Sequence, residues 1–109
     1  MSKINNEEIS FQMIANGGSA TSCFMEAIEE AKQGNIEAAR KLIQDGEEHY
    51  RDAHKVHSEL IQKMANGDNV DLNLLLVHAE DQLMNSEVIK ILAEQIIYLI
   101  SKIKKLEEK

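Results

Sequence analysis

One apolar stripe in the last third of the chain constrains the fold more than any other feature of its 109 residues. Residues three and four apart share one face of an α-helix, and positions at this spacing continue from residue 74 to residue 106. They are occupied by Leu74, His78, Asp81, Asn85, Val88, Leu92, Ile96, Leu99, Ile103 and Leu106. The pattern predicts one long helix with a packing face. Because polar groups on a packing face need partners or a function, we look for a site near its start.

A first helix is predicted in the N-terminal third of the chain. Asn5 or Asn6 can cap its start. Residues 32–35 end it with a lysine, a C-capping glycine and an asparagine that can cap the next helix. Gly17 and Gly18 fall inside the apolar pattern and leave two interpretations open. One is a break or kink in the helix, and the other is close approach of a neighbouring helix or a ligand.

The second and third helices are separated by the clearest turn in the sequence, residues 66–69. The second helix is expected from about Ile36 to Ala65. Asp45 and Gly46 could loosen its middle, although Glu47 and Glu48 after them are good helix formers again. Asp71 or Asn73 can cap the third helix. Its last turns carry lysines that oppose the negative end of the helix dipole.

Three long helices with short connections predict an all-α fold, an antiparallel three-helix bundle formed by residues 1–109 as a single domain. No proline is present to interrupt these helices. The third helix is apolar over more than half of its circumference, because a second apolar set accompanies the stripe. This set consists of Leu72, Leu75, Leu76, Ala79, Leu83, Ala93, Ile97 and Ile100. A helix of this kind is covered on two sides, so we expect its own bundle on one side and another subunit on the other.

Composition excludes several classes of function. The formal net charge is −7, whereas nucleic-acid binding requires a basic face. The densest apolar run, residues 96–100, is far shorter than the roughly 20 residues that span a bilayer, and the N-terminus has no signal-peptide core. The lone Cys23 fits a reducing compartment and is expected to be a buried structural thiol. We therefore expect a cytoplasmic protein that neither binds nucleic acid nor inserts into the membrane.

His78 is the residue on which a reaction can be built. It is either a hydrogen-bonded structural residue or a phosphoryl acceptor, since neutral imidazole is a good nucleophile near neutral pH. Gln82, four residues on, and Asn85, on the same face, can donate hydrogen bonds to phosphoryl oxygens without the repulsion of a carboxylate. The chain contains no glycine-rich phosphate loop. A phosphoryl group on His78 therefore requires a protein donor.

Asp81 has three interpretations. It can orient the ring of His78, or it can be an ordinary solvated helix acid. It can also meet its own copies on the axis of a symmetric oligomer, where a cation or protons must offset the like charges. Elsewhere, His54 and His57 are three residues apart and could clip a metal ion, but no further ligand spacing supports such a site.

The segment around His78 resembles the lactose/cellobiose-type IIA component of the bacterial sugar phosphotransferase system. Residues 74–84 read LLLVHAEDQLM and are similar to the family signature LLLVHAQDHLM. Residues 53–55 and 59–62, AHK and ELIQ, are similar to a segment of the family's second helix. The first helix contributes a further likeness at Asn16, Gly18, Ala20, Ser22 and residues 25–27. The likeness covers nearly the whole chain in the same order.

This resemblance implies three-helix subunits that assemble as a homotrimer, and a phosphotransferase component that works as a phosphohistidine relay. It implies that His78 accepts a phosphoryl group from the phosphocarrier HPr and passes it to a cysteine of the IIB component. The relay would serve uptake of a β-linked disaccharide of the lactose, cellobiose or chitobiose type. It further implies that Asp81 lies at the trimer axis and binds a divalent, magnesium-like ion, with no cofactor needed for the chemistry.

Three residues depart from the family pattern. Glu80 stands where the family has Gln, and we expect little effect because position 80 points away from the stripe. Gln82 stands where the family has His, which removes a titratable group one turn from the acceptor. Thr21 replaces a commonly basic residue, which would alter contacts with a partner or with phosphate.

Two other classes of function stay open. One is a helical-bundle adaptor in which His78 and Asp81 only fix the register of an oligomer. The other is a histidine phosphotransfer domain of two-component signalling, which is typically a monomeric four-helix bundle.

Overall fold

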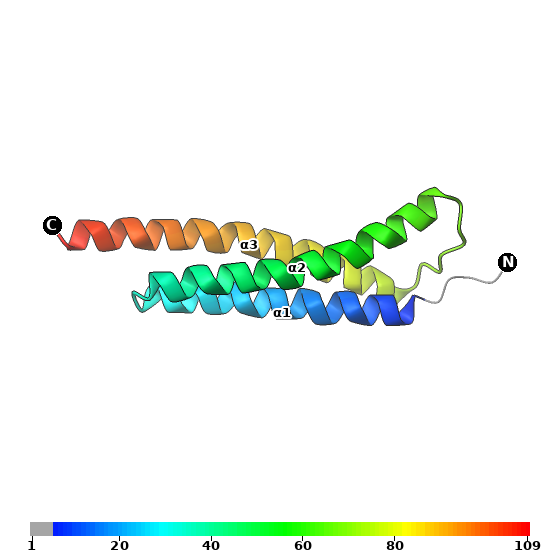
Figure 1. Ribbon diagram of the computed structural model, residues 1–109, viewed down its shortest axis with the longest axis horizontal. Helices are drawn as coiled ribbons and strands as arrows, with labels where there is room; N and C mark the ends of the chain where they lie inside the picture. The colour runs from blue at the N-terminus through cyan, green and yellow to red at the C-terminus, as the bar shows by residue number, and fades with distance from the viewer. Residues whose placement is uncertain (1–5) are drawn as a thin grey trace.

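The computed structural model describes residues 6–109 and consists there of three α-helices. Helix α1 spans Glu7–Lys32, α2 spans Ile36–Ala65 and α3 spans Leu74–Glu107. Consecutive helices run in opposite directions along an elongated bundle (Figure 1). The predicted all-α, three-helix fold is confirmed, and the expected ends of the second helix agree with the structure. None of the helices in these residues combines the length and the apolar character that crossing a membrane requires.

The first helix runs unbroken through its two glycines. Gly17 and Gly18 both belong to α1, so the interpretation of these glycines as a helix break is wrong. Close approach of a neighbouring helix is not found either, because a Cβ placed on either glycine would meet no atom of another element within 4 Å. A glycine costs a helix only about 1 kcal/mol. The burial of Met13, Ala20 and Phe24 on either side offsets that cost.

The start of α1 is tied to the start of α3. Asn6 occupies the N-cap position of α1, but its side chain makes no capping hydrogen bond. Its amide nitrogen donates instead to the backbone carbonyl oxygen of Asp71, and its amide oxygen accepts from Asn73 Nδ2 at 3.0 Å. Asn6 is buried, so a link between two helix ends replaces the predicted cap. The alternative cap, Asn5, lies outside the described residues.

Apolar side chains from all three helices form two core clusters. The cluster nearer the α1–α2 connection contains Ala20, Phe24, Ala27, Ala31, Ala39, Ile43, Ala93 and Ile97. The cluster nearer the other end contains Met13, Ala53, Leu60, Leu76, Ala79 and Leu83. Asp45 and Gly46 do not loosen α2, because the helix is continuous there. The missing side chain of Gly46 leaves room for the ring of Phe24, which packs where a Cβ would stand.

Helix α3 has one face in the bundle and one open face. Its buried apolar residues are Leu76, Ala79, Leu83, Ala93 and Ile97, all members of the predicted second set. Leu72 is an exception, because it precedes α3 and is 68% exposed. The predicted stripe lies on the other face, where each of its apolar members from Leu74 to Leu106 is at least one third exposed. The bundle therefore covers one apolar side of α3 and leaves the second uncovered.

A ladder of polar pairs connects α2 to α3. Its rungs are Glu47–Lys90, Tyr50–Glu87 and His57–Glu80. Each step forward along α2 is matched by a step backward along α3, as antiparallel helices require. We call this set the α2–α3 ladder. The ladder thus adds polar contacts between α2 and α3 to the apolar contacts of the two core clusters.

Candidate functional site

His78 lies in the second turn of α3, and its side chain is exposed. The turn before it is capped by Asn73, whose side-chain oxygen accepts the Leu76 backbone N–H at 2.9 Å, so one of the two predicted caps is confirmed. Within residues 6–109 no hydrogen bond or ion pair engages the His78 ring. Side chains on a helix lean toward its N-terminus, which carries partial positive charge. An anionic group held by His78 would lie in a favourable field.

Gln82 and Asn85 lie on the same side of α3 as His78 but at different distances from it. Gln82 is half-buried one turn further on, and its side-chain oxygen is buried without a hydrogen-bond partner. Because residues four apart on a helix are neighbours, Gln82 can reach a group held by His78. Asn85 is exposed but lies about 10 Å from His78 along the helix axis. The structure therefore brings Gln82 to His78 and does not bring Asn85 there.

Asp81 is exposed on the open face of α3. Its carboxylate makes no hydrogen bond to His78 among the described residues, so orientation of the ring by Asp81 is not borne out. That part of the chain also contains no cluster of His, Cys, Asp and Glu side chains that could hold a metal ion. A divalent cation takes about six or more oxygen ligands. One carboxylate is too few, so a cation at Asp81 would need further copies of the chain or water.

Sequence analysis missed a polar pair on the α2 side of α3. His57 Nδ1 lies 2.7 Å from Glu80 Oε1, and the two side chains are 24% and 28% exposed. Glu80, which was expected to matter little, thus connects α3 to α2. The structure gives no support to the weakly indicated metal clip of His54 and His57, because neither belongs to a metal-binding group among residues 6–109. The signal for the pair was the acid at position 80, since a half-buried carboxylate calls for a partner.

The open face of α3 continues from His78 to the end of the helix. Its large exposed apolar residues are Leu74, Val77, Met84, Val88, Ile91, Leu92, Ile96, Leu99, Ile103 and Leu106. Steps of three and four residues alternate along most of the stripe, as in a left-handed coiled coil. Soluble monomers rarely expose so large a contiguous apolar surface. This face is therefore suited to packing against further helices.

Cys23 is half-buried in α1. Burial raises the pKa of its thiol, and the negative charges of Asp45 and Glu26 raise it further. A thiol that stays protonated is a poor nucleophile. The structure thus agrees with the structural role predicted for Cys23.

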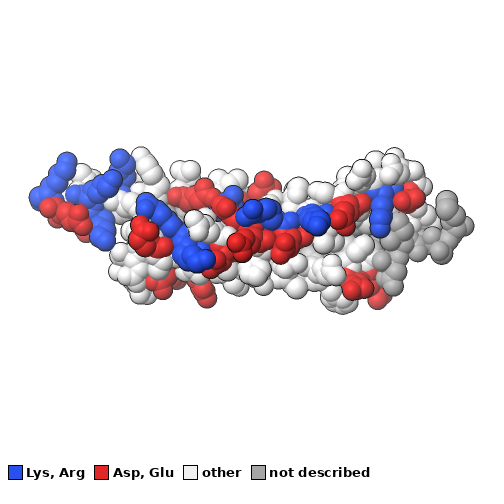
Figure 2. Space-filling model, viewed as in Figure 1, with Lys and Arg blue, Asp and Glu red and all other residues white. Residues whose placement is uncertain are grey.

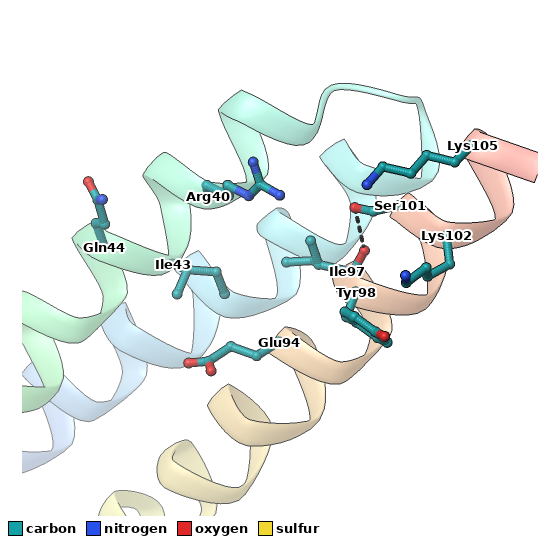
Figure 3. Close-up of a pocket in the computed structure, with 9 residues that line it drawn as sticks. All are labelled: Arg40, Ile43, Gln44, Glu94, Ile97, Tyr98, Ser101, Lys102 and Lys105. Atoms are coloured by element: carbon teal, nitrogen blue, oxygen red, sulfur yellow. Dashed lines mark hydrogen bonds between the residues drawn. The ribbon is translucent and has the colours of Figure 1, made fainter. Parts of the chain in front are cut away.

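A cavity of about 570 Å³ lies between α2 and α3 at the other end of the bundle (Figure 3). Arg40, Lys102 and Lys105 contribute basic side chains to its lining, and Ser101 Oγ donates to the Ile97 carbonyl oxygen beside it at 2.9 Å. Figure 2 shows basic side chains gathered at this end of the molecule. The α3 residues that line the cavity lie about 24–40 Å from His78 along the helix. It therefore takes no part in a site at His78.

Comparison with known proteins gives one consistent family. Residues 8–101 match the family described as PTS system, Lactose/Cellobiose specific IIA subunit. The lichenan-specific phosphotransferase enzyme IIA component of Bacillus subtilis is 47% identical over 97 residues, which cover 89% of this chain and 88% of that protein. The lactose-specific EIIA component of Staphylococcus aureus is 31% identical over 97 residues, which cover 86% of this chain and 94% of that protein.

Solved structures show the same arrangement of helices. The PTS cellobiose-specific enzyme IIA from Bacillus anthracis has a TM-score of 0.90 at 39% identity, covering 96% of this chain and 95% of that one. A structure of the IIA(chitobiose)–HPr complex from the N,N'-diacetylchitobiose branch of the Escherichia coli phosphotransferase system has a TM-score of 0.76 at 32% identity. That match covers 92% of this chain and 97% of the other. Sequence and fold thus agree over nearly the whole chain.

Proposed function

Because the chain belongs to the lactose/cellobiose-specific IIA subunits of the phosphotransferase system, we propose that it relays a phosphoryl group through His78. Membership of this family makes it a phosphotransferase component, as the resemblance predicted. In the proposed relay, His78 accepts the group from HPr and passes it to a cysteine of the IIB component, in support of uptake of a β-linked disaccharide. The relay would operate in the cytoplasm, where an acceptor cysteine stays reduced.

The observation that carries this proposal is the environment of His78. It is exposed in the first turns of a capped helix, and its ring is unengaged among the described residues. By contrast, His57 is engaged by Glu80, and His54 lies against Ser58. An exposed neutral imidazole can be approached by a protein donor and can act as the nucleophile.

The transfer consists of two in-line displacements at phosphorus. A lone pair on a ring nitrogen of His78 forms the new N–P bond while the bond from phosphorus to the donor breaks, and that electron pair returns to the donor. In the second step a cysteine thiolate of the IIB component forms an S–P bond, the N–P bond breaks and the neutral imidazole is restored. Catalysis would come from positioning and hydrogen bonds rather than from acid–base chemistry.

Gln82 is proposed to bind the phosphoryl group carried by His78. Its amide N–H groups can donate to phosphoryl oxygens, while its buried side-chain oxygen faces the protein. The positive end of the α3 dipole would favour the same anion. Asn85, one turn further along, would contact the partner or another subunit rather than the phosphoryl group of its own chain.

The open face of α3 is proposed to be covered by two further copies of the chain, in a homotrimer. Its coiled-coil spacing and its exposed apolar residues support this assembly. Three copies would bring three Asp81 carboxylates to one axis, where a divalent, magnesium-like cation or bound protons must offset their repulsion. Such a cation would neutralise charge and hold the subunits together. The steps at His78 do not involve it.

Mass spectrometry of the intact protein tests the relay. The protein is incubated with phosphoenolpyruvate, Enzyme I and HPr, and one added phosphoryl group, stable in base and labile in acid, is expected. His78→Ala should gain none. His54→Ala, which removes another exposed histidine, is the matched control and should gain the group as the wild type does. Labelling of His78→Ala would refute the assignment.

The adaptor alternative shares the exposed stripe but predicts no phosphorylation. It would be supported if the wild type formed an oligomer and gained no mass while HPr in the same mixture was phosphorylated. The family match favours the sugar relay over a two-component phosphotransfer domain.

A further inference from the structure

The cavity between α2 and α3 has no part in the proposed relay, but it has the size and lining of a ligand site. Its volume of about 570 Å³ falls within the roughly 300–1,000 Å³ of small-molecule pockets. Ile43, Ile97 and Tyr98 supply an apolar wall, and the other lining residues are polar or charged. A pocket with apolar walls and a few polar groups is typical of sites that bind small molecules. The charged groups then decide which class of molecule fits.

The charge of the lining is opposite in sign to that of the chain. Arg40, Lys102 and Lys105 contribute three positive charges. Glu94 contributes one negative charge, so the lining carries a formal charge of +2, whereas the whole chain carries −7. The carboxylate of Glu94 also lies 3.7 Å from Lys90 Nζ, which offsets its charge. The cavity therefore complements an anion.

In the part of the chain that the structure describes, none of the three basic groups pairs with a carboxylate across the cavity. Lys105 makes no hydrogen bond or ion pair with any described residue, and Arg40 pairs with Glu37, one turn away on its own helix. Lys102 Nζ lies over the Tyr98 ring, 5.5 Å from its centroid. Figure 3 shows the Arg40 and Lys105 side chains extending toward each other from α2 and α3. An anion between them would be held from both sides.

The cavity lies on the α2 side of α3, where the α2–α3 ladder stops. Glu94 and Ser101, which line it, continue at steps of seven the spacing of the two ladder acids of α3, and residues seven apart lie on one side of a helix. Beyond the Glu47–Lys90 rung, no ion pair or side-chain hydrogen bond joins α2 to α3 among the described residues. The exposed apolar stripe lies on a different side of α3, so subunit packing through the stripe would not fill the cavity.

The polar groups fit a phosphorylated molecule that also carries hydroxyl groups. A phosphomonoester has a charge of about −1.5 to −2 at pH 7 and three acceptor oxygens, and an arginine guanidinium can bind two of them at once. Ser101 Oγ donates to the Ile97 carbonyl oxygen, so it and the Glu94 carboxylate can accept hydrogen bonds from hydroxyl groups. The lining has one aromatic ring, and Lys102 lies over it, so a nucleobase would have little surface on which to stack. A sugar ring needs no such surface.

We propose that the cavity is a binding site for a sugar phosphate. Arg40, Lys102 and Lys105 bind the phosphoryl group, and hydroxyl groups of the sugar donate to Glu94 and Ser101. The C–H groups of the sugar ring pack against the apolar wall. No bond is made or broken in this site, and binding does not depend on the proposed relay.

Titration of the full chain with glucose 6-phosphate, followed by NMR chemical shifts of the backbone amides, tests this proposal. Shifts should be confined to residues 40–44 and 94–105 and should give a Kd of about 0.1–1 mM, as expected for a ligand of this size. Glucose and inorganic phosphate should each bind at least about fivefold more weakly, because each lacks one half of the contacts.

Substitutions of single basic residues locate the phosphoryl group. Arg40→Gln and Lys105→Gln should each raise the Kd about fivefold to tenfold, because each removes a charge-assisted hydrogen bond. Lys105→Arg keeps the charge and should bind as the wild type does. Lys41→Gln is the matched control, since it removes one positive charge beside Arg40 from a residue that does not line the cavity. Its Kd should stay unchanged.

An absence of saturable shifts, or an equal rise of the Kd in Lys41→Gln, would refute the site. Loss of binding in His78→Ala would also refute it, because the ligand would then lie at the other end of α3. Equal affinities for glucose 6-phosphate and inorganic phosphate, or tighter binding of adenosine monophosphate, would overturn the sugar phosphate as the ligand. A wild type that accepts no phosphoryl group from HPr would refute the proposed relay and leave this inference standing.

Discussion

Gly46 offers a sharp test of the packing between α1 and α2. A Cβ at this position would lie 2.4 Å from Cε1, 2.8 Å from Cδ1 and 3.0 Å from Cζ of Phe24. Phe24 is fully buried, so its ring has no open space to move into. Gly46→Ala should therefore destabilise the protein, although it removes a glycine from the middle of a helix.

Two opposing contributions set the size of the effect. Replacing a glycine in a helix interior with alanine stabilises the helix by about 1 kcal/mol. Overpacking a core costs about 1–3 kcal/mol, and the severe overlap with Phe24 places Gly46→Ala in the upper part of that range. The free energy of unfolding should therefore fall by about 1–2 kcal/mol. For a domain of this size, Tm should fall by roughly 5–10 °C.

Gly17→Ala is the matched control, because it is the same substitution in another buried helical position. A Cβ there meets nothing within 4 Å, so only the gain of about 0.5–1 kcal/mol in the helix remains. Unfolding in urea and on heating, followed by circular dichroism, measures both. All variants need the same protein concentration, since the stability of an oligomer depends on it. Opposite signs are expected for the two variants.

A stability of Gly46→Ala equal to or above that of the wild type would refute the packing argument. A double-mutant cycle sharpens it. Phe24→Leu removes the ring atoms that the new methyl group meets, so Gly46→Ala should cost less in the Phe24→Leu background than alone. An unchanged cost would show that the ring is not the obstacle.

Three further predictions concern the helix ends and two titratable groups. Asn6→Ala removes the two hydrogen bonds that tie the start of α1 to Asp71 and Asn73, and this loss should lower the free energy of unfolding by about 1–3 kcal/mol in urea denaturation. The raised pKa of Cys23 should make its alkylation by iodoacetamide at pH 8 slower than that of free cysteine, and an equal rate would contradict this. Burial, and then the charge and hydrogen bond of Glu87, raise the pKa of Tyr50 above its ordinary value of 10.0. The unfolded state then loses its phenolic proton first, so stability should fall as pH rises through about 10, less steeply in Tyr50→Phe.

The ends of α2 could be predicted because local chemistry marks them. Gly34 and Gly67 flank the helix, and both adopt a φ of 89°, a conformation that favours glycine over other residues. Asn73 could likewise be predicted as the cap of α3 because its oxygen bonds a backbone N–H only three residues away. Signals of this kind depend on neighbours in sequence, so they can be read before the fold is known.

Contacts between helices could not be predicted in the same way. Asn6 is of a residue type that caps helices, but its side chain hydrogen-bonds to Asn73, which is far away in sequence. Helical periodicity shows which face of α3 carries Glu80, but not which residue of α2 stands opposite. That depends on the relative rotation and the register of two helices, which packing of the whole bundle decides. His57 could therefore be recognised as the partner of Glu80 only in the structure.

The distribution of polar residues along the open face of α3 bears on how association and phosphoryl transfer can share one helix. His78, Asp81 and Asn85 lie in its first turns, whereas the stripe from Val88 to Leu106 is apolar. Apolar burial supplies most of the free energy of association, so the later turns can hold the proposed trimer together. The first turns can then keep polar groups whose burial would otherwise oppose assembly. In the proposed relay, a donor that docks at these first turns would therefore leave the apolar part of the proposed subunit contact undisturbed.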